Sequence, residues 1–283
     1  MAIVLAMLSA VLYGWSDYMG GRATRQMSVL KVTLYIEFLM TISYVALVIV
    51  DPAPFIFRDA VWGAVAGIGG VGGVAAFYLA LSMGSISVAS PGAGVLSAVF
   101  PVVAGVAMGE RPSPVAIVGI LIAMTSVMLV SGALSSRREE IAMPSRQMLL
   151  VLASGALFGL WYIALDVAGS ESGWWPLLTS RTLTVPTLLV TAYLLRERLR
   201  IDRMSPAGRR WVLGAWVTIL AANLAYLVAV RSGLLSIVAV IASMYPASTI
   251  GLAIFIDREQ LSKSQWLGIG LAGFALVLVG IGA

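Results

Sequence analysis

Ten apolar runs, each about the length of a membrane span, constrain this chain more than any other feature. A helix needs about 20 predominantly apolar residues to cross the hydrocarbon core of a bilayer. The spacers are short and leave no room for a soluble domain of any size. The sequence therefore predicts an all-α membrane protein with ten transmembrane helices. We expect them at about residues 2–21, 29–50, 60–83, 86–108, 113–133, 147–168, 173–195, 211–232, 234–256 and 263–282.

Composition excludes several other classes of protein. Hydrophobic residues make up 60% of the chain and charged residues 11%, against roughly 45–50% and about 25% in soluble domains. Cysteine and histidine are absent, so we expect no disulfide, no thiol chemistry and no His-based metal site. The sequence holds no nucleophile–base set, P-loop or metal cluster. We therefore predict that the protein is not an enzyme and binds no cofactor.

Basic residues are distributed unevenly between the loops. Fourteen Lys and Arg residues belong to the odd-numbered gaps between runs and three to the even-numbered gaps. Because cytoplasmic loops carry an excess of Lys and Arg, we expect a plasma membrane protein (inner membrane in a bacterium) with both termini outside. The net charge of +5 is then explained by orientation in the membrane, and we expect no binding to nucleic acid. The most basic loop, 195–210, is an orientation signal on this view, with a lipid- or partner-binding role as the alternative.

The chain repeats itself at an offset of 149 residues, where Glu110 meets Glu259. Both glutamates lie at helix–loop junctions, and their recurrence indicates a structural role. Each repeat holds five helices, an odd number, so the two copies must face opposite ways across the membrane. Such inverted repeats are typical of alternating-access transporters. We expect a first repeat at 1–134, a cytoplasmic connecting loop at 135–146 and a second, inverted repeat at 147–283.

Several motifs resemble the EamA-type branch of the drug/metabolite transporter superfamily. They are GWSDYMGG (14–21), GERPSPVAIVGILIAMTSVMLV (109–130), SMYPASTIGLAIF (243–255) and DREQLSKSQWLGIGLAGFALVLV (257–279). The resemblance implies ten helices and the transport of small organic solutes, such as amino acids, sugars, nucleotide derivatives or cationic drugs, often outward. Many similar proteins are drawn with both termini in the cytoplasm, whereas the loop charges here indicate the reverse.

Two charged residues lie deep inside predicted spans. Glu37 and Arg181 are each about nine residues into their runs, which at ~1.5 Å per residue places them near the midplane. A charge there costs roughly 2.5–3.5 kcal/mol, so it needs a reason. Three interpretations stay open: a buried salt bridge between the halves, a separated pair that holds the two ends of a zwitterion, and proton coupling through Glu37. Hydroxyl groups accompany both residues, at Thr33, Thr41 and Tyr44 and at Ser180, Thr184, Thr187 and Thr191.

Asp17 lies about fifteen residues into the first run, toward its predicted cytoplasmic end. It shares one helix face with other polar residues, and that face is unsuited to lipid. Either Asp17 is an interfacial carboxylate, solvated by headgroups or paired with Arg22 or Arg25, or it is a gate-side carboxylate that attracts cations and couples protons. The polar residues on its face are Ser9, Tyr13 and Ser16.

Aromatic and amide side chains occur on the first, third, sixth, eighth and ninth spans, which the family resemblance places around a central cavity. They either contact the solute or pack in the core. Aromatic walls suit cationic or aromatic solutes. The residues are Tyr13, Tyr78, Trp161, Tyr162, Asn223, Tyr226 and Tyr245.

The glycines of the third run match a dinucleotide-binding pattern over 67–72. No strand precedes them, so close helix packing through Gly63, Gly67, Gly69 and Gly73 is the simpler interpretation. Pro246 predicts a kink in the ninth run.

We therefore predict a secondary transporter that moves an amino acid or a cationic metabolite or drug, with export favoured. A facilitative uptake carrier for a quaternary ammonium compound or another metabolite, a channel and a non-transporting receptor are the alternatives. The partners we expect are the solute and the lipid bilayer, while protons as coupling ion and a homodimer stay open.

Overall fold

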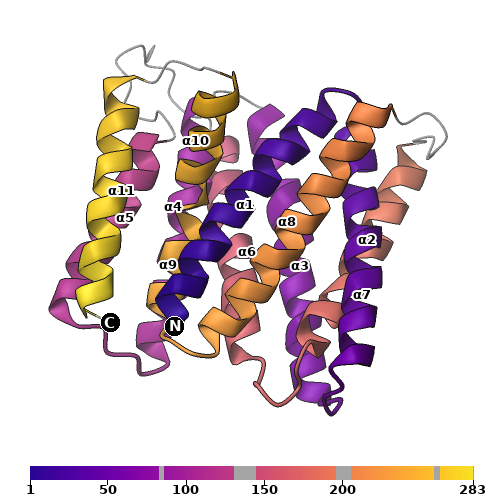
Figure 1. Ribbon diagram of the computed structural model, residues 1–283, viewed down its shortest axis with the longest axis horizontal. Helices are drawn as coiled ribbons and strands as arrows, with labels where there is room; N and C mark the ends of the chain where they lie inside the picture. Colours follow the sequence, from indigo (N-terminus) through magenta and orange to yellow (C-terminus); the bar gives the residue numbers. More distant parts are fainter. Residues whose placement is uncertain (83–85, 131–144, 196–204, 258–261, 283) are drawn as a thin grey trace.

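The computed structural model describes residues 1–82, 86–130, 145–195, 205–257 and 262–282 (Figure 1). All regular secondary structure in these residues is helical. The helices are α1 (Ala2–Thr24), α2 (Val29–Val50), α3 (Phe57–Ser82), α4 (Ile86–Ala107), α5 (Pro114–Val130), α6 (Ser145–Val167), α7 (Trp175–Leu194), α8 (Pro206–Val230), α9 (Leu235–Ser243), α10 (Tyr245–Asp257) and α11 (Lys263–Gly282).

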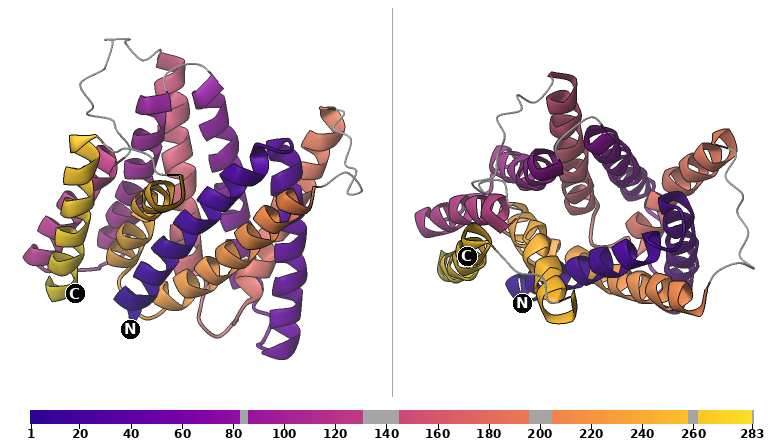
Figure 2. Two further views of the ribbon diagram at one scale, coloured as in Figure 1. Left: turned by 45° about the horizontal axis from the view of Figure 1, so that its top comes forward. Right: turned by 90° about the horizontal axis from the view of Figure 1, so that it is seen from above.

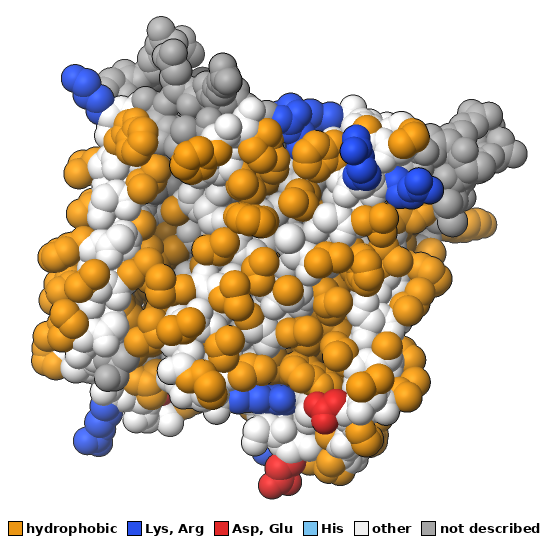
Figure 3. All heavy atoms as spheres, in the orientation of Figure 1, with side chains coloured by type: hydrophobic (Ala, Val, Ile, Leu, Met, Phe, Trp, Pro, Cys, Tyr) orange, Lys and Arg blue, Asp and Glu red, His pale blue; other side chains and the backbone are white. Residues whose placement is uncertain are grey.

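The predicted class, an all-helical multi-pass membrane protein, is confirmed. In the described part of the chain, six helices are long and apolar enough to cross a bilayer, namely α1, α2, α3, α6, α8 and α11. The shorter apolar helices are α4, α5 and the α9–α10 segment. Hydrophobic side chains cover the face of the bundle seen in Figure 3, as expected for a surface in contact with lipid. α7 is more polar because it carries five threonines, Ser180 and Arg181.

The ninth apolar run forms two helices rather than one. α9 ends at Ser243 and α10 begins at Tyr245, with Met244 between them. Pro246 has no backbone N–H, so it cannot donate to the carbonyl of Ala242 and continue the helix. The predicted kink at this proline is therefore a break in the helix.

The helices form two layers with a pair at each edge (Figure 2). One layer contains α3, α4 and α6, and the other contains α1, α8 and α10. α1 packs along α8, and α3 packs along α6 and α7. The edges are formed by α2 with α7 and by α5 with α11. A space between the layers can thus be lined from both halves of the chain.

The two ends of the bundle differ in charge. Both termini lie at one end (Figure 1), here called the terminal end. At the other end α1 and α10 finish and α2, α8 and α11 start, and Lys and Arg side chains gather over it in Figure 3. We call it the basic end. Its described basic residues are Arg22, Arg25, Lys31, Arg146, Arg209, Arg210 and Lys263. The described helix ends on either side of the odd-numbered gaps thus lie at one end, as predicted, while which end faces the cytoplasm stays a prediction.

The glycines of α3 let two helices approach closely. A Cβ at Gly67 would lie 2.2 Å from the carbonyl oxygen of Ser180 on α7. A Cβ at Gly69 would lie 2.6 Å from the carbonyl oxygen of Leu157 on α6. The close packing predicted for this glycine-rich stretch is therefore present. It also brings the α7 segment beside Arg181 against α3.

Glu110 caps a helix of the other half. The preceding residue, Gly109, has a φ of 100°, a conformation that favours glycine. The turn directs the Glu110 carboxylate to the start of α9, where it accepts hydrogen bonds from the backbone N–H groups of Leu235 and Ser236. A carboxylate at a helix N-terminus accepts hydrogen bonds from free backbone N–H groups and interacts favourably with the helix dipole. This contact agrees with a structural role for Glu110, whereas Glu259 lies outside the described residues.

Candidate substrate site

A cavity of about 590 Å³ lies between the two layers. Its walls come from α1, α2, α3, α4, α6, α7, α8 and α10, and we call it the central cavity. The residues that line it are Tyr13, Ser16, Asp17, Gly20, Gly21, Thr24, Val29, Val32, Thr33, Ile36, Glu37, Gly70, Val71, Val74, Phe77, Ala93, Gly94, Ser97, Phe158, Trp161, Tyr162, Arg181, Thr184, Leu188, Ile219, Asn223 and Tyr245.

The central cavity opens toward the basic end. Its lining runs to Gly21 and Val29, which are exposed at the end of α1 and the start of α2. On the terminal side, Tyr226 and Leu227 are fully buried. Farther toward that end, Arg231 donates to the carbonyl oxygens of Gly169 and Gly173 at 2.9 and 2.8 Å and so ties the end of α8 to the α6–α7 loop. The cavity is accessible from one end of the bundle.

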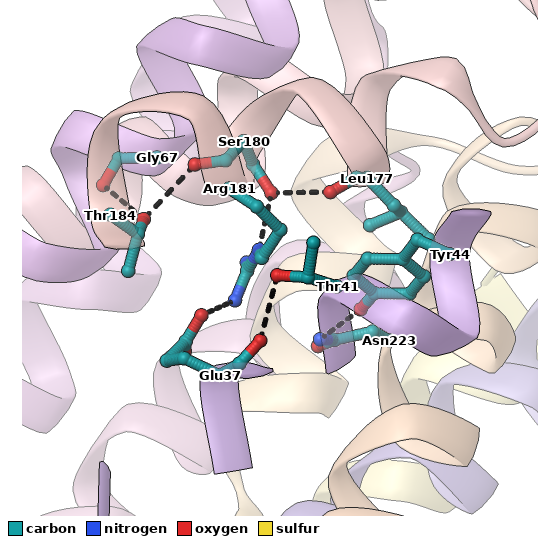
Figure 4. A network of polar contacts seen from close by, with 9 residues as sticks. All are labelled: Glu37, Thr41, Tyr44, Gly67, Leu177, Ser180, Arg181, Thr184 and Asn223. Atoms are coloured by element: carbon teal, nitrogen blue, oxygen red, sulfur yellow. Dashed lines mark hydrogen bonds and ion pairs between the residues drawn. The ribbon is translucent and has the colours of Figure 1, made fainter. Parts of the chain in front are cut away.

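Glu37 and Arg181 form an ion pair in the cavity wall (Figure 4). Nη1 of Arg181 donates to Oε2 of Glu37, and Nε donates to Oγ of Ser180 at 3.0 Å. The side chains are 7% and 14% exposed. No other ion pair is seen among the described residues. The salt bridge considered from the sequence is therefore present in this state, and the zwitterion and proton hypotheses both require it to open in another.

The hydroxyl groups near the ion pair mostly donate hydrogen bonds to backbone carbonyl oxygens. Thr184 donates to the carbonyl oxygens of Ser180 and Gly67 at 3.0 and 3.3 Å, which joins α7 to α3. Thr41 donates to the carbonyl oxygen of Glu37 at 2.8 Å. Among these hydroxyls only that of Ser180 bonds to the guanidinium. The hydroxyl stripes thus stabilise the helices around the ion pair more than the pair itself.

Aromatic rings and one amide complete the setting of Arg181. Its guanidinium carbon lies 5.6 Å from the ring centre of Tyr44 and 5.7 Å from that of Trp161. The Tyr44 hydroxyl accepts from Nδ2 of Asn223 at 2.8 Å, and Oδ1 of Asn223 accepts from the Tyr13 hydroxyl at 2.6 Å. A chain of contacts therefore runs from the cavity wall at Tyr13 to the ion pair.

Asp17 is the one cavity carboxylate without a partner in the described chain. Its side chain is exposed to the cavity and makes no hydrogen bond or ion pair with a described residue. Arg22, a partner considered from the sequence, instead lies over the rings of Tyr18 and Trp211 at 5.4 and 5.7 Å. Asp17 therefore lines the cavity, and its gate-side role stays a prediction.

The structure places the other sequence-predicted residues as follows. Tyr13, Trp161, Tyr162, Asn223 and Tyr245 line the central cavity. Tyr226 does not: it is fully buried and donates to the carbonyl oxygen of Tyr162 at 3.3 Å, so core packing describes it. Tyr78 belongs to α3, but its side chain lies outside the described residues. Two further aromatic lining residues, Phe77 and Phe158, were not predicted from the sequence, because a phenylalanine in an apolar run carries no polar signal.

Comparison with known families agrees with this architecture. The model of the EamA-like transporter family matches residues 1–132 and 145–281. The chain belongs to the EamA-like transporter family. The resemblance found in the motifs is thereby confirmed, and with it the general role of a membrane transporter. No curated protein matches the chain. One solved structure, described only as the crystal structure of a protein, has a TM-score of 0.76 at 13% identity and covers 99% of this chain and 96% of its own. That likeness concerns the fold alone.

Proposed function

We propose that this EamA-family transporter is a secondary carrier for a small organic cation, with Asp17 as the group that binds it. The proposal depends on one observation. Asp17 is a cavity carboxylate with no partner among the described residues, while Arg181, the only basic residue of the described lining, is already paired with Glu37. The described lining thus has one net negative charge. A cation gains from such a site, whereas an anion would be repelled.

Aromatic rings near Asp17 favour the same class of solute. Tyr13, Trp161, Tyr162 and Tyr245 come from three helices, α1, α6 and α10, and line the cavity with it. Tyr13 and Tyr245 meet edge to face, with ring centres 6.5 Å apart. A cation over an aromatic face gains about 0.5–2 kcal/mol, and more as it is desolvated. A metabolite or drug with an ammonium group fits this combination of one carboxylate and several rings.

An amino acid is the second candidate, because Arg181 and Glu37 both line the cavity. The substrate carboxylate would take the place of Glu37 on the guanidinium in a bidentate contact. Glu37 would then be free to hold the ammonium group or a proton. This route requires the ion pair to open, which the cation route does not.

We also propose that transport proceeds by alternating access between two inverted repeats, at 1–134 and 147–283, joined by 135–146. The family match in two segments supports this division. The packing supports it as well. α1 and α6 are the first helices of the two repeats, α3 and α8 are the third helices, and each first helix packs against the third helix of the other repeat. A cavity open at one end only is the state such a mechanism requires.

Export follows if the basic end faces the cytoplasm, as the loop charges indicate for a plasma membrane protein with both termini outside. The cavity would then load from the cytoplasm. Protonation of Asp17 in exchange for the solute would couple export to an inward proton gradient.

Counterflow in proteoliposomes tests the proposal. Quaternary ammonium compounds, amino acids, sugars and nucleosides are compared at pH 6 and pH 8. We expect saturable exchange of the ammonium compounds, weaker at pH 6, and its loss in Asp17→Asn. Glu171→Gln, which changes an exposed carboxylate of the α6–α7 loop, is the matched control and should transport normally. Undiminished exchange by Asp17→Asn would refute the role of Asp17, and no saturable exchange of any solute would favour a channel or a receptor.

A further inference from the structure

A second hollow lies on the outer face of the bundle, apart from the central cavity. It has a volume of about 390 Å³ and lies between α1 and α8 at the basic end. Met19 of α1 and Arg210, Trp211 and Gly214 of α8 line it, and we call it the α1–α8 groove. Nothing in the transport cycle proposed above uses these residues.

The floor of the α1–α8 groove is apolar and formed by a close approach of the two helices. A Cβ at Gly214 would lie 2.5 Å from Sδ of Met19, so the glycine makes room for the methionine side chain. Beside the floor, the rings of Trp211 and Tyr18 meet edge to face with centres 6.4 Å apart. Arg22 covers both rings and donates to the Tyr18 hydroxyl at 3.0 Å. One wall is therefore a packed cluster rather than a set of loose side chains.

Arg210 supplies an unused positive charge at the rim. Its side chain is exposed, and it makes no hydrogen bond or ion pair with any described residue. A guanidinium presents several donors in a fork that matches a phosphate group. The groove thus offers a phosphate-binding group directly next to an apolar floor.

An apolar track leads from the groove along the bundle toward the bilayer interior. On α1 it continues through Val11 and Trp15, which are 42% and 41% exposed. On α8 it continues through Leu213 and Val217, which are 40% and 52% exposed. Residues at this spacing follow one face of each helix. An acyl chain lying on this track would place its headgroup beside Arg210.

We propose that the α1–α8 groove is a binding site for an anionic glycerophospholipid, with Arg210 on the phosphate and the acyl chains on Met19, Trp211 and the track below. Arg210 should favour an anionic lipid over a zwitterionic one, because a zwitterionic headgroup already neutralises its phosphate with its own cationic group. Basic pockets between transmembrane helices are suited to anionic headgroups. The proposal concerns lipid binding and does not depend on the solute or on Asp17.

Native mass spectrometry of the full chain in neutral detergent tests the site. The protein is titrated with phosphatidylglycerol and with phosphatidylcholine of the same acyl chains. We expect about a fivefold preference for phosphatidylglycerol, the effect of one basic residue near an anionic headgroup. Arg210→Gln should abolish the preference and Arg210→Lys should keep most of it.

Arg209→Gln and Arg25→Gln are the matched controls, because both side chains are exposed arginines at the same end and neither lines the groove. They should keep the preference. Size-exclusion chromatography checks that each variant is folded. Equal binding of the two lipids by the wild type would overturn the proposal, and so would an equal loss in Arg209→Gln, which would indicate diffuse charge. Competition by millimolar inorganic phosphate would assign the site to a soluble anion instead.

Discussion

Arg181 on α7 donates to Glu37 on α2, and this ion pair lies in the wall of the central cavity rather than between lipid and protein. The two residues are 144 positions apart in the chain and come from opposite halves. Because both side chains are nearly buried, each needs the other as its counter-charge. The pair is therefore at once a structural contact between the halves and a latent binding site.

Glu37→Gln should destabilise the protein by about 3–5 kcal/mol, because it leaves the Arg181 guanidinium buried without a counter-charge. The double variant Glu37→Gln/Arg181→Gln should lose less stability than the sum of the two single variants. Thermal unfolding in detergent measures both effects, with Glu171→Gln as the neutral control. Additive losses would mean that the two charges do not depend on each other.

Arg181→Gln separates the two substrate classes. If a zwitterion binds through the guanidinium, the variant should abolish counterflow of carboxylate-bearing solutes and spare pure cations. The reason is that Asp17 and the aromatic walls remain in place for an ammonium group. Counterflow of an amino acid and of a quaternary ammonium compound in the same preparation measures the split. Equal survival of both classes would exclude the zwitterion hypothesis.

Asn223→Leu should cost about 1–3 kcal/mol, because the hydroxyls of Tyr13 and Tyr44 both lose their partner. The loss should couple to Tyr44→Phe in a double-mutant cycle, since that change removes one of the two hydroxyls. Chemical or thermal unfolding measures the cycle. Thr33→Val is the control: its hydroxyl bonds only the carbonyl oxygen of Val29 on the same helix, and the change should cost under about 0.5 kcal/mol.

Gly67→Ala should lower stability by about 1–3 kcal/mol, because the new Cβ would meet the backbone of Ser180, which cannot rotate away. The shift of α7 should also weaken solute binding, since Arg181 follows Ser180 directly. Gly270→Ala on α11 is the matched control. A Cβ there meets nothing within 4 Å, and alanine in a helix is favoured over glycine by about 0.5–1 kcal/mol. Equal effects of the two variants on unfolding temperature would contradict the close packing of α3 with α7.

Much of the fold could be predicted from the sequence because a bilayer allows few solutions. Every backbone polar group must be satisfied within lipid, so apolar runs of this length become helices. The positions of Glu37 and Arg181 were evident for the same reason, since a charge at such depth is costly and therefore conspicuous. The effect of Pro246 could also be predicted, because a proline disrupts a helix wherever it lies, although the helix breaks there instead of bending.

Other features depended on which helices became neighbours. Asp17 had the same sequence neighbours under either interpretation, and only the tertiary structure shows that it lines the cavity while Arg22 lies over the rings of Tyr18 and Trp211. Tyr226 and Tyr245 looked alike as aromatics in apolar runs, yet the first is fully buried and the second lines the cavity. The sequence by itself thus determined that the chain lies in a bilayer, where its helices are, and which polar residues are unsuited to contact with lipid. The tertiary structure decided which of those residues share the cavity, because contacts between helices far apart in the chain leave no periodic trace in any one of them.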